Sequence, residues 1–384
     1  MIIQAPYSCD PLLSKGRTHF EEENPQEIFL KDKEKVIHSS AFRRLEYKTQ
    51  VFVNHVGDHY RNRLTHSLEV AHVAKTIARK LRINEDLTET VALSHDLGHP
   101  PFGHAGEESL NRVTKGFGGF DHNVQTIKIL VTLEQRYPNF NGLNLSFEAL
   151  EGIAKHNGPI IPKSNKSHLD LLSLFDGTLF NPQTQPSLEA QVASLADDIA
   201  YINHDLDDGL RAGMFNIDEL LSLPVIGDIL TSIKKSNIPD PLIKYDLIRQ
   251  LSALMINDLV AQTLANIDSN GIKDYSDVIV QTQATATFSR DVENAKNIIK
   301  DFLMQRVYRN FRVNRMSEKS QDLIEKIFNR YLASPNCLPT EWYTKIEDLS
   351  NMNLVAGYIT DYIAGMTDRY AIEEYKRLFD PNFF

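Results

Sequence analysis

The sequence predicts a mainly α-helical protein, and two observations support this prediction. Apolar residues recur three or four positions apart, the spacing of helices, along most of the 384-residue chain. The sequence contains no series of strands that alternate apolar and polar residues and are joined by hairpin turns. A chain of this length can bury one large core or two smaller ones.

The first informative helix is expected to follow His66. Val70, Val73, Ile77 and Leu81 form a stripe of the kind that faces a core, and His66 stands at its head. The imidazole should therefore point inward. A single histidine on such a stripe can also be an ordinary capping or core residue.

A second helix is expected in the run LTETVALSHDLG, residues 87–98. Gly98, followed by Pro100 and Pro101, should end it just after His95 and Asp96. Side chains at a helix end can converge on an ion, so this pair is a candidate site.

A third helix is expected over residues 188–206, with Val192, Leu195, Ile199 and Ile202 on one face. Asp197 and Asp198 interrupt the apolar pattern. Two adjacent carboxylates cannot point the same way, so only one of them should join the site. With His66, His95 and Asp96, the site would offer two imidazoles and two carboxylates to one divalent cation suited to phosphate chemistry.

His104 and Glu107 follow the His95-Asp96 pair and lie three residues apart. On a helix they would share one face, where the carboxylate could hold the imidazole in its charged form for general acid catalysis. Alternatively, His104 caps a helix and Glu107 faces solvent. The Gly-rich segment TKGFGGFDHN ends in a plausible helix cap, Asp121.

Six sequence segments, in order, resemble one known family. They are HSSAFRRLEYKTQVF, HYRNRLTHSLEVAHVA, HDLGHPPFGHAGEESL, GGFDHN, ADDIAYINHDLDDG and DYIAGMTDRYA, which together extend from His38 to Ala371. The H…HD…D order resembles the HD superfamily of metal-dependent phosphohydrolases. The full set resembles the dGTPase-like bacterial branch of the deoxynucleoside triphosphate triphosphohydrolases.

This resemblance implies an HD-domain helical phosphohydrolase fold with additional C-terminal helices. It also implies hydrolysis of deoxynucleoside triphosphates (dNTPs), dGTP or others, to deoxynucleoside and tripolyphosphate. The implied cofactor is one divalent ion, Mg, Mn, Fe, Co or Ni, and further Mg²⁺ can accompany the triphosphate. The implied metal ligands are His66, His95, Asp96 and Asp197, and His104 with Glu107 matches the family's catalytic pair.

The resemblance also implies substrate contacts. Arg63, His99 and His122 match phosphate contacts, whereas Tyr201 and Asp205, four apart on one helix, match residues that hold the triphosphate end and the sugar. Gln50 and Val51 match positions that read the 3′ hydroxyl and pack on the deoxyribose, which would exclude a ribose. Tyr362 is a weaker sugar-pocket candidate, with a core tyrosine as the alternative. Taken singly, each of these residues could be an ordinary surface, turn or core residue.

Three regions follow from the resemblance: an N-terminal arm (1–27), an HD-type metal-binding catalytic core (28–215), and a C-terminal helical region (216–384) that completes the pocket and an oligomer interface. Family members form tetramers or hexamers. Two rival functions stay open: another HD-type nucleotide phosphohydrolase, either a phosphodiesterase or a monophosphatase, and a catalytically silent nucleotide sensor or nucleic-acid binder.

Composition limits the partners. Lys and Arg number 41 against 51 Asp and Glu, and this net charge of −10 argues against a dedicated nucleic-acid coat. The only cysteines, Cys9 and Cys337, are too few for a disulfide framework or a zinc ribbon, so we expect a reducing cytoplasm. The sequence shows no signal peptide and no apolar span of membrane length, so we expect no membrane association.

One basic feature stands apart from these motifs. Arg306, Arg309, Arg312 and Arg315 recur every three residues and should form a drifting cationic stripe on one helix. A solvated face or a subunit interface is the usual reading of such a stripe. The other reading is a site for an allosteric nucleotide or single-stranded nucleic acid, since arginines bind phosphates and the intervening Tyr308 and Phe311 could stack on bases.

Overall fold

The computed structural model describes residues 4–50, 61–160, 171, 174, 181–236 and 238–383. Within these residues the chain is helical, and its only β pairings are three isolated bridges, which confirms the predicted mainly α class. The α-helices are α1 (Ile28–Ile37), α2 (Ser40–Arg44), α3 (Arg63–Leu81), α4 (Glu85–Ser94), α5 (Gly103–Thr114), α6 (His122–Lys128), α7 (Phe147–Ala154), α9 (Leu188–Arg211), α10 (Ile226–Lys235), α11 (Asp240–Ser269), α12 (Tyr275–Ile279), α13 (Arg290–Leu303), α14 (Phe311–Ala333), α15 (Thr340–Tyr343), α16 (Met352–Ala364) and α17 (Asp368–Phe379).

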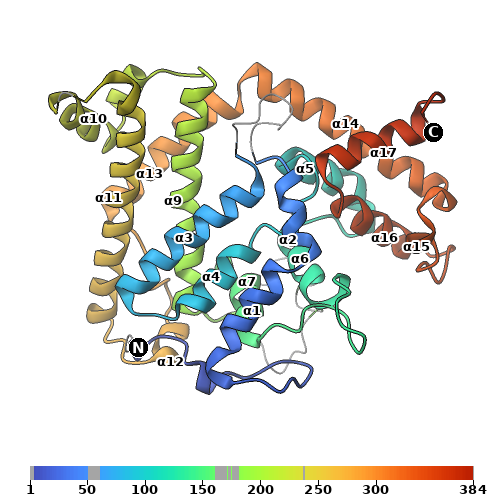
Figure 1. Ribbon diagram of the computed structural model, residues 1–384, viewed down its shortest axis with the longest axis horizontal. Helices are drawn as coiled ribbons and strands as arrows, with labels where there is room; N and C mark the ends of the chain where they lie inside the picture. The colour runs from blue at the N-terminus through green and yellow to red at the C-terminus, as the bar shows by residue number, and fades with distance from the viewer. Residues whose placement is uncertain are drawn as a thin grey trace.

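Helices α3, α4 and α9 pack against one another at the centre of the molecule (Figure 1). Each begins at a polar cap, Asn62, Asn84 or Ser187, whose side chain accepts a hydrogen bond from a backbone N–H of the first turn. Val70 of α3 and Val192 of α9 are fully buried, as the apolar spacing predicted. The three helices expected from the sequence therefore form, and they face one another.

Two groups of helices flank this centre (Figure 1). Helices α10, α11 and α13 lie on one side, where α11 and α13 pack on α9. On the other side, α14, α16 and α17 pack together with α5 and share a second hydrophobic cluster. The first cluster extends from the N-terminal arm to Val307.

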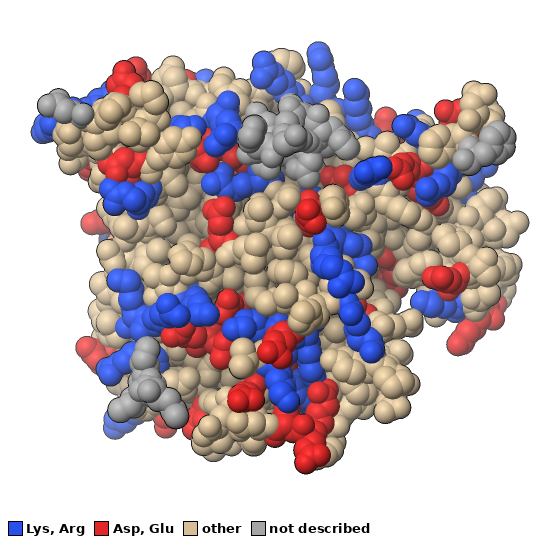
Figure 2. All heavy atoms as spheres, viewed as in Figure 1, with Lys and Arg blue, Asp and Glu red and all other residues tan. Residues whose placement is uncertain are grey.

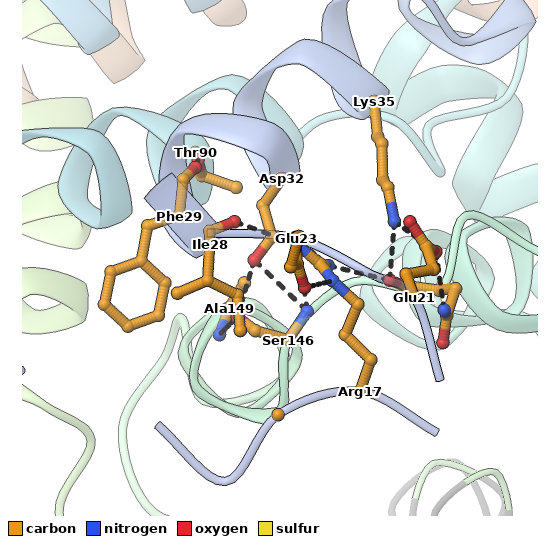
Figure 3. A network of polar contacts seen from close by, with 12 residues as sticks. Arg17, Glu21, Glu23, Ile28, Phe29, Asp32, Lys35, Thr90, Ser146 and Ala149 are labelled. Carbon is orange, nitrogen blue, oxygen red and sulfur yellow. Dashed lines mark hydrogen bonds and ion pairs between the residues drawn. The ribbon is translucent and has the colours of Figure 1, made fainter. Parts of the chain in front are cut away.

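The predicted N-terminal arm lies against the core. The buried Glu189 carboxylate accepts hydrogen bonds from Ser8 Oγ (2.8 Å) and Cys9 N (2.9 Å). Further along, Arg17 pairs with Asp32, which also accepts a hydrogen bond from Ser146 (Figure 3). The arm is thus held by buried polar contacts, while the region boundaries at 27/28 and 215/216 stay predictions.

Two buried polar links join the C-terminal helices to the turn that follows α4. The Lys48 ammonium donates to the carbonyls of His99 and Ala364, although these residues lie far apart in the sequence. The Asp368 carboxylate accepts hydrogen bonds from the backbone N–H groups of Thr49 (2.9 Å) and Phe102 (2.8 Å). Ala364 at the end of α16 and Asp368 at the start of α17 therefore hold the segment of Lys48 and Thr49 beside the turn between α4 and α5.

Acidic and basic side chains are interspersed over the face of the molecule shown in Figure 2. Among the described residues, no helix is both long enough and apolar enough to cross a membrane. Cys9 is buried and Cys337 is exposed, and neither forms a disulfide.

Candidate metal centre and active site

Packing of α3, α4 and α9 brings the four predicted metal ligands together. His66 lies in the first turn of α3, His95 and Asp96 directly follow α4, and Asp197 lies in the middle of α9. Asp197 Oδ1 is 2.9 Å from His66 Nε2 and 3.7 Å from His95 Nε2. His95 Nε2 is also 3.4 Å from Asp96 Oδ1.

The hydrogen bonding of these residues fits a metal ion. His95 Nδ1 is 2.7 Å from the Ala92 carbonyl, so this nitrogen carries the proton and donates. Its Nε2 is then a bare, buried acceptor without a hydrogen-bond partner among the described residues. Ligand atoms of His66, His95 and Asp96 all lie within 4.8 Å of one another. Imidazole and carboxylate donors of this kind suit a borderline divalent cation.

The adjacent carboxylates of α9 have different partners. Asp197 faces the histidines, whereas Asp198 binds Lys296 (2.9 Å) and Lys300 (2.6 Å) of α13. This division follows from helix geometry, since adjacent side chains point in different directions. The arrangement supports Asp197 as the ligand.

Asp96 also binds two predicted phosphate contacts. Its Oδ2 accepts a hydrogen bond from Arg63 (2.7 Å), and its Oδ1 lies 2.9 Å from His99 Nδ1. Burial alone would raise the pKa of Asp96, but the charge of Arg63, with those of the neighbouring histidines, holds this pKa well below its usual range. Asp96 is thus a fixed anion, as a ligand of a cation should be.

A second cluster lies beside the ligands and centres on Glu107. Glu107 Oε1 is 2.8 Å from His122 Nδ1, and Oε2 is 3.6 Å from His104 Nδ1. His122 stacks on His99, with ring centroids 3.9 Å apart. Although burial opposes it, hydrogen bonding from His104 and His122 holds the Glu107 pKa below its ordinary value.

His122 owes its position to the helix cap predicted at Asp121. The Asp121 side chain accepts hydrogen bonds from the backbone N–H groups of Asn123 and Val124 in the first turn of α6, and His122 is the first residue of that helix. Burial lowers the pKa of His122, but the hydrogen bond to Glu107 and its charge outweigh burial and raise the pKa above its ordinary value. Gly98 permits the close packing, because a Cβ there would lie 2.1 Å from the His122 carbonyl oxygen.

The four predicted metal ligands, together with Arg63, His99, His104 and His122, line a cavity of about 350 Å³. A second cavity of about 590 Å³ adjoins it and shares Gln50, His104, Tyr201, Met304 and Tyr308 with the first. The first cavity carries the charged groups, and the second extends along α14. Together they offer one charged and one less charged compartment with a common wall.

Asp205 lies beneath this wall rather than in the cavity. It is buried and accepts a hydrogen bond from Tyr308, whose ring stacks parallel to that of Tyr201 with centroids 6.1 Å apart. Burial raises the pKa of Asp205 to about 7. Asp205 therefore contacts Tyr308 and lines neither cavity, and its predicted contact with the triphosphate stays a prediction.

Of the predicted sugar contacts, Tyr362 lies away from the site. Val51 lies outside the described residues. Tyr362 lines a different cavity, together with Trp342 and Tyr370, and its hydroxyl lies 3.0 Å from that of Tyr370. This placement favours the alternative of a core tyrosine.

Several residues that line this cavity were not predicted to belong to the site, among them His156, Lys300 and Tyr308. Lys300, Met304 and Tyr308 all line the cavity, and their spacing of four residues could have indicated a shared helix face. No sequence pattern indicates that this face turns toward the predicted metal ligands.

The expectation of one arginine stripe on one helix is wrong. A π-helical segment, Met304–Tyr308, ends before Asn310, which caps the new helix α14. Arg306 pairs with Glu219, whereas Arg312 and Arg315 lie over the exposed ring of Phe311. Basic side chains gather along the upper edge of the molecule over α14 (Figure 2).

The fold and site define an HD-domain phosphohydrolase. A family model described as "HD domain" matches residues 63–202, which contain all four predicted metal ligands, and one described as "Phosphohydrolase-associated domain" matches residues 286–377.

Full-length relatives then specify the family. A deoxyguanosinetriphosphate triphosphohydrolase-like protein of Caulobacter sp. (strain K31) is 46% identical over 381 residues, covering 98% of this chain and 96% of the relative. A protein of the same description from Bradyrhizobium diazoefficiens is 47% identical, covering 98% and 96%, and one from Rickettsia bellii is 45% identical, covering 99% of both chains. The chain belongs to this deoxyguanosinetriphosphate triphosphohydrolase-like family of HD-domain proteins.

Proposed function

We propose that the protein hydrolyses dNTPs to deoxynucleoside and tripolyphosphate. One observation supports this most directly: His104 and His122, the two histidines paired with Glu107, line the same cavity as the four predicted metal ligands. An alkoxide is a poor leaving group, so release of a nucleoside requires an acid near the ester oxygen. A metal ligand set alone would not supply one.

His66, His95, Asp96 and Asp197 would hold one divalent cation. When bound, such an ion polarises a phosphoryl oxygen and lowers the pKa of water. Its identity is left open among Mg, Mn, Fe, Co and Ni, with further Mg²⁺ accompanying the triphosphate.

The residues around this centre have complementary tasks. Arg63 and Lys300 supply fixed positive charge for the phosphates, and His99 adds an imidazole donor. Burial and the nearby Arg63 charge lower the pKa of His99 well below its ordinary value, so His99 acts as a neutral group. Lys300 must exchange its bond to Asp198 for a phosphate when substrate binds.

The proton transfers are assigned to the Glu107 cluster. Water attacks the α-phosphorus, the bond to the 5′ oxygen breaks, and His104 gives its proton to that oxygen. The proton released by the attacking water then restores the acid. Glu107 orients His104, and His122 holds Glu107 from the other side.

The nucleoside is assigned to the adjoining cavity. Tyr201 and Tyr308, on the wall common to both cavities, present stacked rings to the sugar and base, and Gln50 presents a side-chain amide for the 3′ hydroxyl. The proposal includes a homo-oligomer, tetrameric or hexameric, whose interface lies in the region 216–384.

The test is product identification. Purified protein is incubated with each dNTP and each NTP, with Mg²⁺ or Mn²⁺, and products are separated by chromatography and ³¹P NMR. We expect deoxynucleoside and tripolyphosphate from one or more dNTPs and no turnover of NTPs. Monophosphate with pyrophosphate, or cleavage of dNMPs and phosphodiesters only, would favour the rival HD-type phosphohydrolases. Binding of dNTPs without turnover would favour a nucleotide sensor.

A further inference from the structure

His66 has a hydrogen-bond partner on the side of its ring that faces away from the ligand set. Its Nδ1 lies 3.1 Å from Nδ1 of His204, a buried residue of α9. His204 Nε2 in turn contacts the carboxylate of Glu69, three residues after His66 on α3. The three side chains form a row between α3 and α9 that starts at the proposed metal centre.

When a metal ion is bound to His66, only one arrangement of protons satisfies this row. A neutral imidazole that ligates a metal through Nε2 carries its proton on Nδ1. His66 Nε2 is the nitrogen that faces Asp197 and the other predicted ligands, so with the ion bound there His66 Nδ1–H donates to His204 Nδ1. His204 then has its proton on Nε2, where Glu69 accepts it.

The hydrogen-bonded row that starts at His66 reaches the surface. The corresponding hydrogen bond of His95, the other histidine of the proposed centre, does not. The Glu69 side chain is 48% exposed, and its Oε1 lies 3.3 Å from Arg61. His95 instead donates to a backbone carbonyl, that of Ala92. A carboxylate raises the basicity of an imidazole more than a carbonyl does, because it carries a full negative charge.

We propose that His204 and Glu69 are positioning residues that set the tautomer and basicity of His66, and thereby the affinity of the centre for its metal ion. This inference rests on the proposed metal centre. The competing explanation is that His204 and Glu69 merely satisfy each other between two packed helices.

Three variants divide the row into its parts. His204→Asn keeps an acceptor near His66 Nδ1 but loses the connection to Glu69, His204→Leu loses both, and Glu69→Gln keeps an acceptor but removes the charge. His72→Leu, an exposed histidine of the same helix, is the matched control. Each full-length protein is stripped of metal and titrated with Co²⁺ against a competing chelator, with visible spectra recorded.

We expect His204→Leu to weaken Co²⁺ binding roughly 10- to 100-fold, the range for loss of such outer partners, and the other two variants to weaken it by about 10-fold or less. The d–d bands of bound Co²⁺ should shift in all three variants and should not shift in the His72→Leu control. Thermal unfolding of the metal-free proteins gives the structural contribution separately.

The outcomes separate the two levels of the proposal. If the wild-type protein binds Co²⁺ and the variants bind it equally well with unchanged spectra, the positioning role is wrong and the metal centre stands. If the metal-free His204→Leu protein does not fold, the Asn and Gln variants decide in its place. If the wild-type protein binds no Co²⁺, Mn²⁺ or Mg²⁺, both the metal centre and the inference built on it are overturned.

Discussion

His122 and Glu107, fifteen residues apart in sequence, form a 2.8 Å hydrogen bond between the first turn of α6 and the helix α5. The carboxylate that the sequence pairs with His104 thus has a second and closer histidine partner. Glu107 is therefore fixed from one side while its other oxygen faces the exposed His104.

The first prediction tests the acid. His104→Ala should keep metal and substrate binding but lose about 10²- to 10⁴-fold in kcat, the usual contribution of a general acid. His122→Asn should lose less, because it releases Glu107 without removing the acid. Single-turnover kinetics on a cleaved dNTP measure both. Near-normal turnover of His104→Ala together with inactive His122→Asn would move the acid to His122.

The pH dependence of Glu107→Gln is the second prediction. The pKa of His122 is raised by Glu107, so its positive charge persists to a higher pH than that of an ordinary histidine and is lost as pH rises through this raised pKa. Without the Glu107 charge, this loss should begin at lower pH. The alkaline limb of kcat/KM against pH should therefore move toward acid in Glu107→Gln, and an unmoved limb would show that His122 does not contribute its charge to the reaction.

The third prediction concerns the metal ligands. His66→Ala, His95→Ala, Asp96→Ala and Asp197→Ala should each lose bound metal and nearly all activity while circular dichroism stays helical. Asp198→Ala is the matched control, because its carboxylate binds lysines and should be dispensable for metal. Metal analysis of the purified proteins is the measurement. Full occupancy in Asp197→Ala with loss in Asp198→Ala would exchange their roles.

A fourth prediction follows from Asp205. Its pKa is about 7 in the folded protein, above the ordinary value near 3.8, because the site is buried. The folded state then binds the proton more tightly than the unfolded state, so Asp205 lowers the free energy of unfolding progressively as pH rises from about 4 to about 7. The slope should be at most about 1.4 kcal/mol per pH unit. Asp205→Asn should flatten this part of the stability profile measured by urea unfolding, and an unchanged slope would contradict the assignment.

The fifth prediction separates two lysines that share one carboxylate. Lys300 lines the cavity and Lys296 does not, although both bind Asp198. Lys300→Ala should raise KM for a dNTP by about tenfold or more, consistent with loss of a charged contact of roughly 1.5 kcal/mol. Lys296→Ala should leave KM within about twofold. Equal effects would mean that Lys300 acts only through Asp198.

Much of this architecture could be predicted from the sequence, because regular apolar spacing and helix-ending glycine and proline residues are local signals. They located α3, α4 and α9 and the histidines and carboxylates that those helices carry. The faces of α13 and α14 could not be predicted in the same way. Whether Lys300 and Tyr308 face α9 depends on how segments about one hundred residues apart in the sequence pack together. The spacing of residues within one helix carries no information about that packing.

The arginine spacing failed for a related reason. A recurrence of arginine every three residues indicates one helix only if that helix continues without a break. Here the preceding helical segment ends before Asn310, which caps the next helix, α14. A break of this kind redirects side chains that periodicity would place together. Tyr362 also matched a motif, but it lines another cavity.

The Lys48 and Asp368 links have a consequence for how the chain matures. Asp368 lies 319 residues beyond Thr49 and 266 beyond Phe102, yet it binds the backbone of both. During synthesis, the hydrogen bonds that Thr49 and Phe102 donate to Asp368 cannot form before the start of α17 has left the ribosome. The nascent chain can thus acquire its early helices well before these two segments beside the candidate site are held in place.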